Sequence, residues 1–144
     1  MDGAASNEAC SLIEEARHAL LFARAKGGPQ AMAVRDALEL GTIGGARLLG
    51  WDDQIGSLEP GKQADIAVWR LSGLGHADVV DPVAALVLGA APPLELLLVG
   101  GRPVVERDRV VTADEHELTR SAVAAHRSLM ARAGTVQGKE GTTS

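Results

Sequence analysis

Apolar side chains recur every three or four residues near the start of the chain, and this spacing predicts an amphipathic helix. The repeating positions are Leu12, Ile13, Ala16, Leu20 and Ala23. Ser6 or Asn7 would cap the N-terminus of this helix, because their side chains accept hydrogen bonds from backbone N–H groups. Gly27, Gly28 and Pro29 would end it.

Further helices are predicted on both sides of the middle of the chain. The same spacing predicts a second helix over about 30–40. A third, shorter helix is expected over about 42–49, between Gly41 and Gly50. A C-terminal helix would begin at a capping box formed by Thr112 and Glu115 and run to about Ala133. The segment 83–88 is short and wholly apolar, so it fits either a helix or a strand.

Strands are predicted where short apolar runs are bounded by turn residues. In the middle of the chain, residues 55–69 suggest a short strand, a tight turn at Pro60 and Gly61, and a second strand. Residues 94–99 and 103–106 suggest a hairpin across Gly100 and Gly101, and 109–111 a third short strand. The chain therefore mixes helices with antiparallel strands.

Composition narrows the classes of function. The chain has 144 residues and a formal net charge of −5, which argues against nucleic acid as a partner. No apolar stretch is long enough for a membrane span, which takes about 20 residues. The one cysteine, Cys10, cannot form an intrachain disulfide and fits a cytoplasmic protein. No basic and apolar leader opens the chain, so we expect no signal peptide.

Five blocks of the sequence resemble the metal-dependent amidohydrolase superfamily. The most specific is Gly56–Ile66 (GSLEPGKQADI), which we name the turn segment. The others are Asp2–Asn7 (DGAASN), Gly44–Gly50 (GGARLLG), Asp81–Val87 (DPVAALV) and Leu98–Val105 (LVGGRPVV). They follow the order and spacing of the cytosine-deaminase-like branch. Within it, the blocks are most similar to 8-oxoguanine deaminases and to aminohydrolases of purine- or triazine-like rings, the hydroxyatrazine type included.

The resemblance implies an α/β fold that is only part of a larger enzyme. Residues 1–50 would be the end of the last strand of a (β/α)8 barrel and the helices after it. Residues 51–111 would be the C-terminal strands of a small composite β-sandwich, followed by a helix at 112–133 and a disordered tail at 134–144. A barrel alone takes about 250 residues, so this chain cannot hold one.

The resemblance also implies a reaction and a metal. The family hydrolyses C–N bonds of small heterocyclic substrates with hydroxide from a bound divalent metal, zinc or iron in this branch. Asp2 matches the aspartate at the end of the eighth barrel strand, which is both catalytic and a metal ligand. Relatives often form dimers, which allows a homo-oligomer here too.

The family's other metal ligands have no counterpart in this sequence. There is no His-x-His pair, and we expect the four histidines to be solvated: His18, His76, His116 and His126. The chain alone is therefore expected to be inactive. The alternative is a non-catalytic α+β module that serves interaction or assembly. Met1 stands where the family commonly has a valine before the aspartate, which suggests a start assigned inside a longer reading frame.

Overall fold

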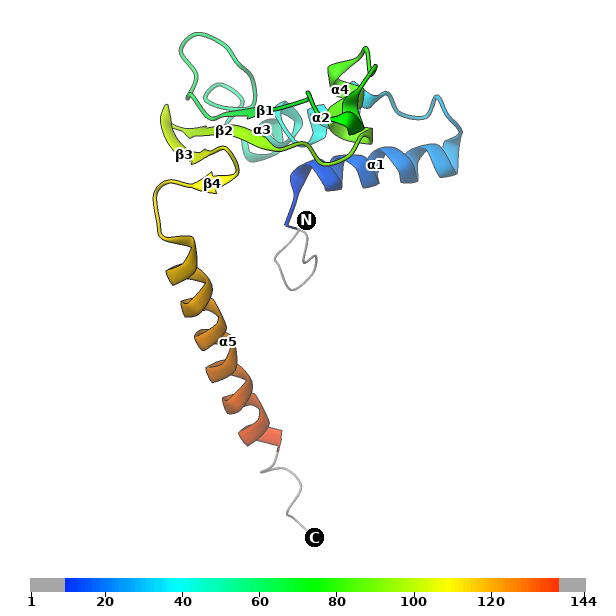
Figure 1. The fold of residues 1–144 in the computed structure, drawn as a ribbon. Coiled ribbons are helices and arrows are strands. Elements are labelled where there is room, and N and C mark those ends of the chain that lie inside the picture. Colours follow the sequence, from blue (N-terminus) through cyan, green and yellow to red (C-terminus); the bar gives the residue numbers. More distant parts are fainter. Residues whose placement is uncertain (1–9, 138–144) are drawn as a thin grey trace. The chain divides into compact units, whose positions relative to one another are not determined.

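The computed structural model describes residues 10–137 and divides into two units, the first ending at Arg109 and the second beginning at Val110 (Figure 1). The elements in chain order are α1 (Leu12–Gly27), α2 (Val34–Leu40), α3 (Ile43–Leu49), β1 (Ile66–Trp69), the 3-10 turn η1 (Leu74–His76), α4 (Pro82–Leu88), β2 (Leu94–Val99), β3 (Arg102–Glu106), β4 (Arg109–Val110) and α5 (Glu115–Gln137). Helices and strands are mixed, as expected of an α/β fold.

A small helical core holds the first unit together. Helices α1, α2 and α4 pack on one another around Ala16, Leu20, Ala37 and Val87, and Leu20 and Val87 have no exposed surface. Partly buried apolar residues surround this cluster: Met32, Val34, Leu38 and Val83. Of the predicted apolar positions, Ala16, Leu20 and Ala37 are confirmed as buried, whereas Leu12 at the start of α1 is 57% exposed.

One end of α1 differs from the sequence expectation and the other agrees with it. Its N-cap is Ser11, whose hydroxyl oxygen accepts a hydrogen bond from the Glu14 N–H at 3.3 Å. The predicted cap was Ser6 or Asn7, and both lie outside the described residues. The C-terminal end was predicted correctly, because the Gly28 N–H caps the helix by donating to the Arg24 carbonyl. Helix α2 begins at Val34, four residues later than expected.

The segment 83–88, whose sequence fitted either a helix or a strand, is helical. Asp81 is its N-cap and accepts a hydrogen bond from the Val83 N–H at 2.9 Å, while Pro82 occupies the first turn. At the other end, the Arg17 guanidinium donates to the carbonyls of Val87 at 2.7 Å and Gly89 at 2.5 Å. These carbonyls lie at the end of α4, so Arg17 caps α4 from α1.

The strands form one antiparallel sheet in the order β1-β2-β3-β4. Ile66 pairs with Leu98 and Val68 with Leu96 between β1 and β2, and Leu97 pairs with Val105 between β2 and β3. The predicted hairpin across Gly100 and Gly101 is confirmed. The strand predicted before Pro60 is wrong, because residues 55–58 form no strand and instead lead into a loop.

In the second unit, α5 extends further than the sequence indicated. Its cap is Asp114, whose carboxylate accepts from the N–H groups of His116 at 2.8 Å and Glu117 at 3.1 Å. The expected capping box at Thr112 is therefore wrong. Residues 134–137, predicted as part of a disordered tail, are helical. Among the described helices, none is long and apolar enough to cross a membrane.

Candidate functional site

The predicted metal ligand, Asp2, lies outside the described residues, so its surroundings are not part of the structure. Within residues 10–137, no group of three or more His, Cys, Asp or Glu side chains comes together in a way that could hold a metal ion. A catalytic zinc takes three protein ligands and one open position. The described part of the chain does not provide such a site.

Three of the histidines are exposed where they are described. His18 lies on α1, and His116 and His126 lie on α5, and none of the three is buried. They agree with the expectation of solvated side chains. None of them belongs to a cluster of metal-ligating groups within the described residues.

His76 corrects the sequence expectation, because it is buried and not solvated. Its residue is 8% exposed, and its Nε2 lies 2.9 Å from the Ala90 carbonyl oxygen. A side chain added at Gly89 would approach the His76 ring at 3.3 Å, so the ring is packed against the backbone that follows α4. A buried polar group needs such a partner. His76 therefore holds the loop before α4 to the segment after it.

The turn segment is built around the ammonium of Lys62, whose side chain is only 12% exposed. The Lys62 Nζ donates to the Asp52 carbonyl at 2.5 Å and to the Ser57 hydroxyl at 2.6 Å, and it lies 3.4 Å from Glu59 Oε1. The Ser57 hydroxyl in turn donates to the Glu59 carboxylate. These bonds hold the loop of residues 52–62 around one lysine, so Lys62 has a structural role in the turn segment.

The same network keeps Glu59 ionised. The hydrogen bond from Ser57 and then the charge of Lys62 lower the pKa of Glu59 below its usual value. Because the pKa of Glu59 is lower in the folded state, the pairing stabilises the fold at pH values above the ordinary pKa of a glutamate. This stabilisation is lost as the pH falls through the lowered pKa. The Glu59 side chain is 61% exposed, so solvent screens the contribution.

Two further residues of the turn segment tie it to neighbouring elements. Gly56 has φ of +89° and lies against α3, where an added side chain would meet Ala46 Cβ at 2.7 Å and Ile43 Cα at 2.9 Å. The Asp65 carboxylate accepts from the Gly100 N–H at 2.7 Å, in the turn between β2 and β3. The segment therefore joins α3 to the sheet.

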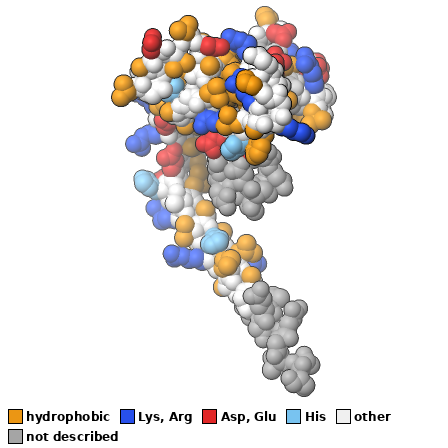
Figure 2. Space-filling model, turned by 90° about the vertical axis from the view of Figure 1, so that its right-hand side faces the viewer, with side chains coloured by type: hydrophobic (Ala, Val, Ile, Leu, Met, Phe, Trp, Pro, Cys, Tyr) orange, Lys and Arg blue, Asp and Glu red, His pale blue; other side chains and the backbone are white. Residues whose placement is uncertain are grey.

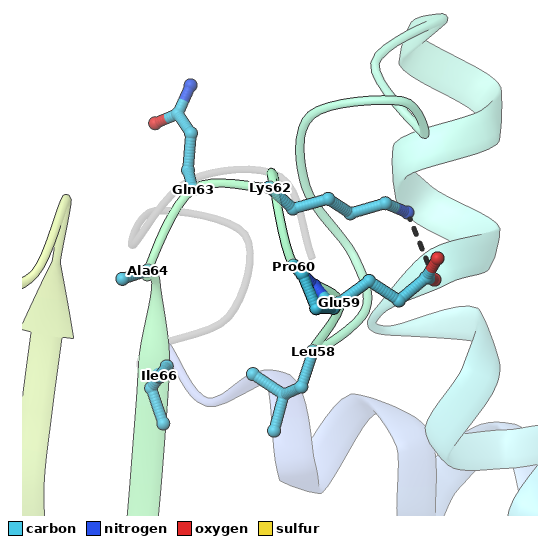
Figure 3. A pocket seen from close by; sticks show the side chains of 7 residues that line it. All are labelled: Leu58, Glu59, Pro60, Lys62, Gln63, Ala64 and Ile66. Carbon is cyan, nitrogen blue, oxygen red and sulfur yellow. Dashed lines mark ion pairs between the residues drawn. The ribbon is translucent and has the colours of Figure 1, made fainter.

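An open pocket of about 220 Å³ lies beside β1. It is lined by Leu58, Glu59, Pro60, Lys62, Gln63, Ala64 and Ile66. In Figure 3 the paired side chains of Lys62 and Glu59 extend together, and Gln63 points away from them. Leu58 and Ile66 give the pocket apolar side chains, and its one cation is already neutralised. This chemistry fits an apolar side chain better than a charged substrate.

Lys62→Met tests whether the ammonium holds the turn segment together. We expect the free energy of unfolding to fall by about 2–3 kcal/mol, because hydrogen bonds from a charged donor contribute about 1.5–3 kcal/mol each. Urea denaturation followed by tryptophan fluorescence measures the change. The matched control is Lys26→Met at the exposed end of α1, where a loss below about 1 kcal/mol is expected. Equal losses in the two variants would contradict the structural role.

Similarity to known proteins covers most of the chain. The model of the amidohydrolase family matches residues 1–126. The chain is 46% identical to an 8-oxoguanine deaminase from Pseudomonas aeruginosa over 101 residues, which is 70% of this chain and 22% of that protein. It is 38% identical to a 5-methylthioadenosine/S-adenosylhomocysteine deaminase from Desulforudis audaxviator over 131 residues, which is 90% of this chain and 30% of that protein.

The chain is also similar to solved structures of deaminases and related hydrolases. An adenosine deaminase from Xanthomonas campestris with bound zinc is 31% identical, with a TM-score of 0.79, over 92% of this chain and 30% of that one. An atrazine chlorohydrolase from Arthrobacter aurescens in complex with zinc is 35% identical, with a TM-score of 0.78, over 85% of this chain and 28% of that one. The chain thus spans less than a third of the length of the relatives it matches.

Proposed function

The chain belongs to the amidohydrolase family, and from this premise we propose that it is the C-terminal part of a metal-dependent hydrolase that deaminates a purine- or triazine-like ring. The observation that carries the proposal is the 46% identity to an 8-oxoguanine deaminase over 101 residues. In such a reaction, water adds its oxygen to the ring carbon that bears the amino group. The carbon–nitrogen bond breaks, ammonia leaves with one proton of the water, and the other proton stays on the product ring, which now carries the oxygen.

Asp2 is the residue of this chain that we propose for the metal site. Its support is the DGAASN block together with the zinc found in two structures that the chain resembles. Because residues 10–137 hold no metal-binding group, the remaining ligands would lie in the part of the relatives that this chain does not span. Zinc is the metal that the similar structures favour, with iron as the alternative.

The proposed architecture assigns each described element to a larger molecule. Helices α1 to α3 would follow the last strand of a (β/α)8 barrel, and the sheet β1–β4 would be one part of a composite β-sandwich. Support comes from the sheet itself, which contains no fully buried residue in its four strands. A sheet of a sandwich buries one face against a second sheet, and that layer is absent from the described chain.

The proposal is tested by the activity of a chimera. The Pseudomonas aeruginosa 8-oxoguanine deaminase would receive this chain in place of its own matching C-terminal region. We expect the chimera to release ammonia from 8-oxoguanine, and the purified 144-residue chain to release none, because a single carboxylate cannot replace the several ligands of a catalytic metal. Methylthioadenosine assayed in parallel reports on the choice of ring.

Two outcomes would contradict the proposal. A folded, zinc-loaded chimera without deaminase activity on either substrate would favour the alternative, a non-catalytic α+β interaction or assembly module. Ammonia release by the isolated chain would mean that it carries a complete active site of its own. A zinc assay and a thermal melt of the chimera, with the intact relative as control, distinguish inactivity from failure to fold.

A further inference from the structure

The last turn of α4 and the residues after it are held by two side chains from distant parts of the sequence. Arg17 of α1 donates to the carbonyls of Val87 at 2.7 Å and Gly89 at 2.5 Å. The Nε2 of His76 in η1 lies 2.9 Å from the Ala90 carbonyl oxygen. A carbonyl can only accept, so this Nε2 carries the hydrogen of the bond. We name the three carbonyls and the two side chains that hold them the latch.

Gly89 lets the backbone and the imidazole ring come together in the latch. A side chain added at Gly89 would collide with the Ala85 carbonyl oxygen and meet the His76 ring at 3.3 Å. The Gly89 N–H donates to that same carbonyl and ends α4. Carbonyls at the end of a helix have no partner within it, and the helix dipole favours a cation there. The latch therefore supplies partners that α4, with seven residues, does not supply itself.

Both side chains of the latch are shielded from solvent. His76 is 8% exposed, and Arg17 is only partly exposed, with both of its hydrogen bonds partly buried. Figure 2 shows, in contrast, Lys and Arg side chains that lie at the surface of the first unit among acidic and hydrophobic ones. Solvent screens charges at the surface, whereas a charged donor contributes more where its partner is shielded. Loss of Arg17 would leave the carbonyl of the fully buried Val87 without this donor.

The latch lies where the helical core meets the sheet (Figure 1). The principal contacts between elements of the first unit join helix to helix or strand to strand. Residues 89–93 lead from α4 into β2, and η1 lies on the stretch that leads from β1 to α4. Arg17 thus ties α1 to the chain that enters β2, and His76 ties the chain that leaves β1 to the same place. Just beyond it, the Arg70 N–H donates to the Pro93 carbonyl at 3.0 Å, beside the pairing of β1 with β2.

We infer that the latch makes the helical core and the sheet open as one cooperative unit. Proteins open locally in contiguous units, and regions that share few contacts can open separately. The turn segment joins α3 to the sheet, and the latch adds a second junction through α1. Without Arg17, α1 would keep its apolar packing on α2 and α4 but lose its bonds to the chain that enters β2. The sheet would then open while the helices stay folded, whatever reaction the chain serves.

Hydrogen exchange of the full 144-residue chain, measured by mass spectrometry in increasing urea, tests the latch. In the unaltered chain, we expect the best protected amides of α1 and β2 to have protection factors within about threefold of each other. In Arg17→Met, the protection of β2 is expected to fall at least about tenfold below that of α1. The matched control is Arg24→Met, because Arg24 on the same helix donates to the Met32 carbonyl at 3.1 Å, away from the latch. Its variant is expected to keep the two protections together.

Two further variants keep the test decisive if Arg17→Met does not fold. Arg17→Lys keeps the charge but not the planar fork that reaches two carbonyls, so we expect a smaller separation in the same direction. His76→Phe keeps a ring, removes the donor to Ala90, and is expected to separate the two protections as Arg17→Met does. Equal losses of protection in α1 and β2 in the latch variants would overturn the inference. A tenfold difference already present in the unaltered chain, or an equal separation in Arg24→Met, would overturn it as well.

Discussion

Gly56→Ala is expected to lower the free energy of unfolding by more than about 3 kcal/mol. Two separate costs combine at this position. Gly56 has φ of +89°, in a region that costs an L-residue about 1–2 kcal/mol. A new Cβ would also approach Ala46 Cβ at 2.7 Å and the Ile43 Cα at 2.9 Å. The first atom belongs to a buried residue and the second to the backbone of α3, so neither can move without displacing the helix.

Gly61→Ala is the matched control for this prediction. Gly61 has φ of +96°, but an added Cβ would meet nothing within 4 Å. The control therefore isolates the conformational cost, and we expect a loss of about 1–2 kcal/mol. Urea denaturation monitored through Trp51 and Trp69 measures both variants. Equal losses would mean that the contact with α3 does not matter, and would contradict the close packing of the turn segment on that helix.

Elements whose signals are local could be predicted from the sequence. The hairpin of β2 and β3 is specified by two consecutive glycines, and both have positive φ, +55° at Gly100 and +76° at Gly101, as a tight hairpin turn requires. Helix α1 followed from apolar spacing, and α1 and α3 both end at glycines that the sequence indicated. In each case, the residues that decide the structure lie within a few positions of one another.

Features that depend on distant partners could not be predicted. The sequence predicts a solvated side chain for His76, because nothing near it in the sequence indicates the Ala90 carbonyl that it contacts. Arg17 reads as one of several charges on α1, although it caps α4 through carbonyls 70 and 72 residues away. The strand expected before Pro60 is absent because Lys62 donates hydrogen bonds to the Asp52 carbonyl and the Ser57 hydroxyl, and these bonds hold the segment as a loop.

The candidate metal site was predictable only through the resemblance. Neither the composition nor the periodicity of the sequence sets Asp2 apart from the other acidic residues. Asp2 also lies outside the described residues. The family match across residues 1–126 includes it. The turn segment, in contrast, is the most specific block of the sequence, and its residues serve to join α3 to the sheet. The sequence features that identify the family best are thus structural, and those proposed for the chemistry are few.

Asp2→Ala in the chimera with the Pseudomonas aeruginosa 8-oxoguanine deaminase is expected to lower kcat/KM for 8-oxoguanine by more than about 100-fold. Even residues that only support a metal ligand cost about 10–100-fold when they are changed, and loss of a ligand itself costs more. The zinc content of the purified chimera, measured by atomic absorption, is expected to fall as well. A purely structural role for Asp2 would lower the melting temperature without this selective loss of metal.

Asp53→Ala is the control, because Asp53 is an exposed acid that precedes the turn segment and lies in no metal-binding group of the described residues. Its variant is expected to keep the full zinc content and activity. Asp2→Asn adds a second comparison, since it retains the shape of the side chain and removes its charge. Full zinc content and unchanged kcat/KM in both Asp2 variants would exclude Asp2 from the metal site, even if the chimera is an active deaminase.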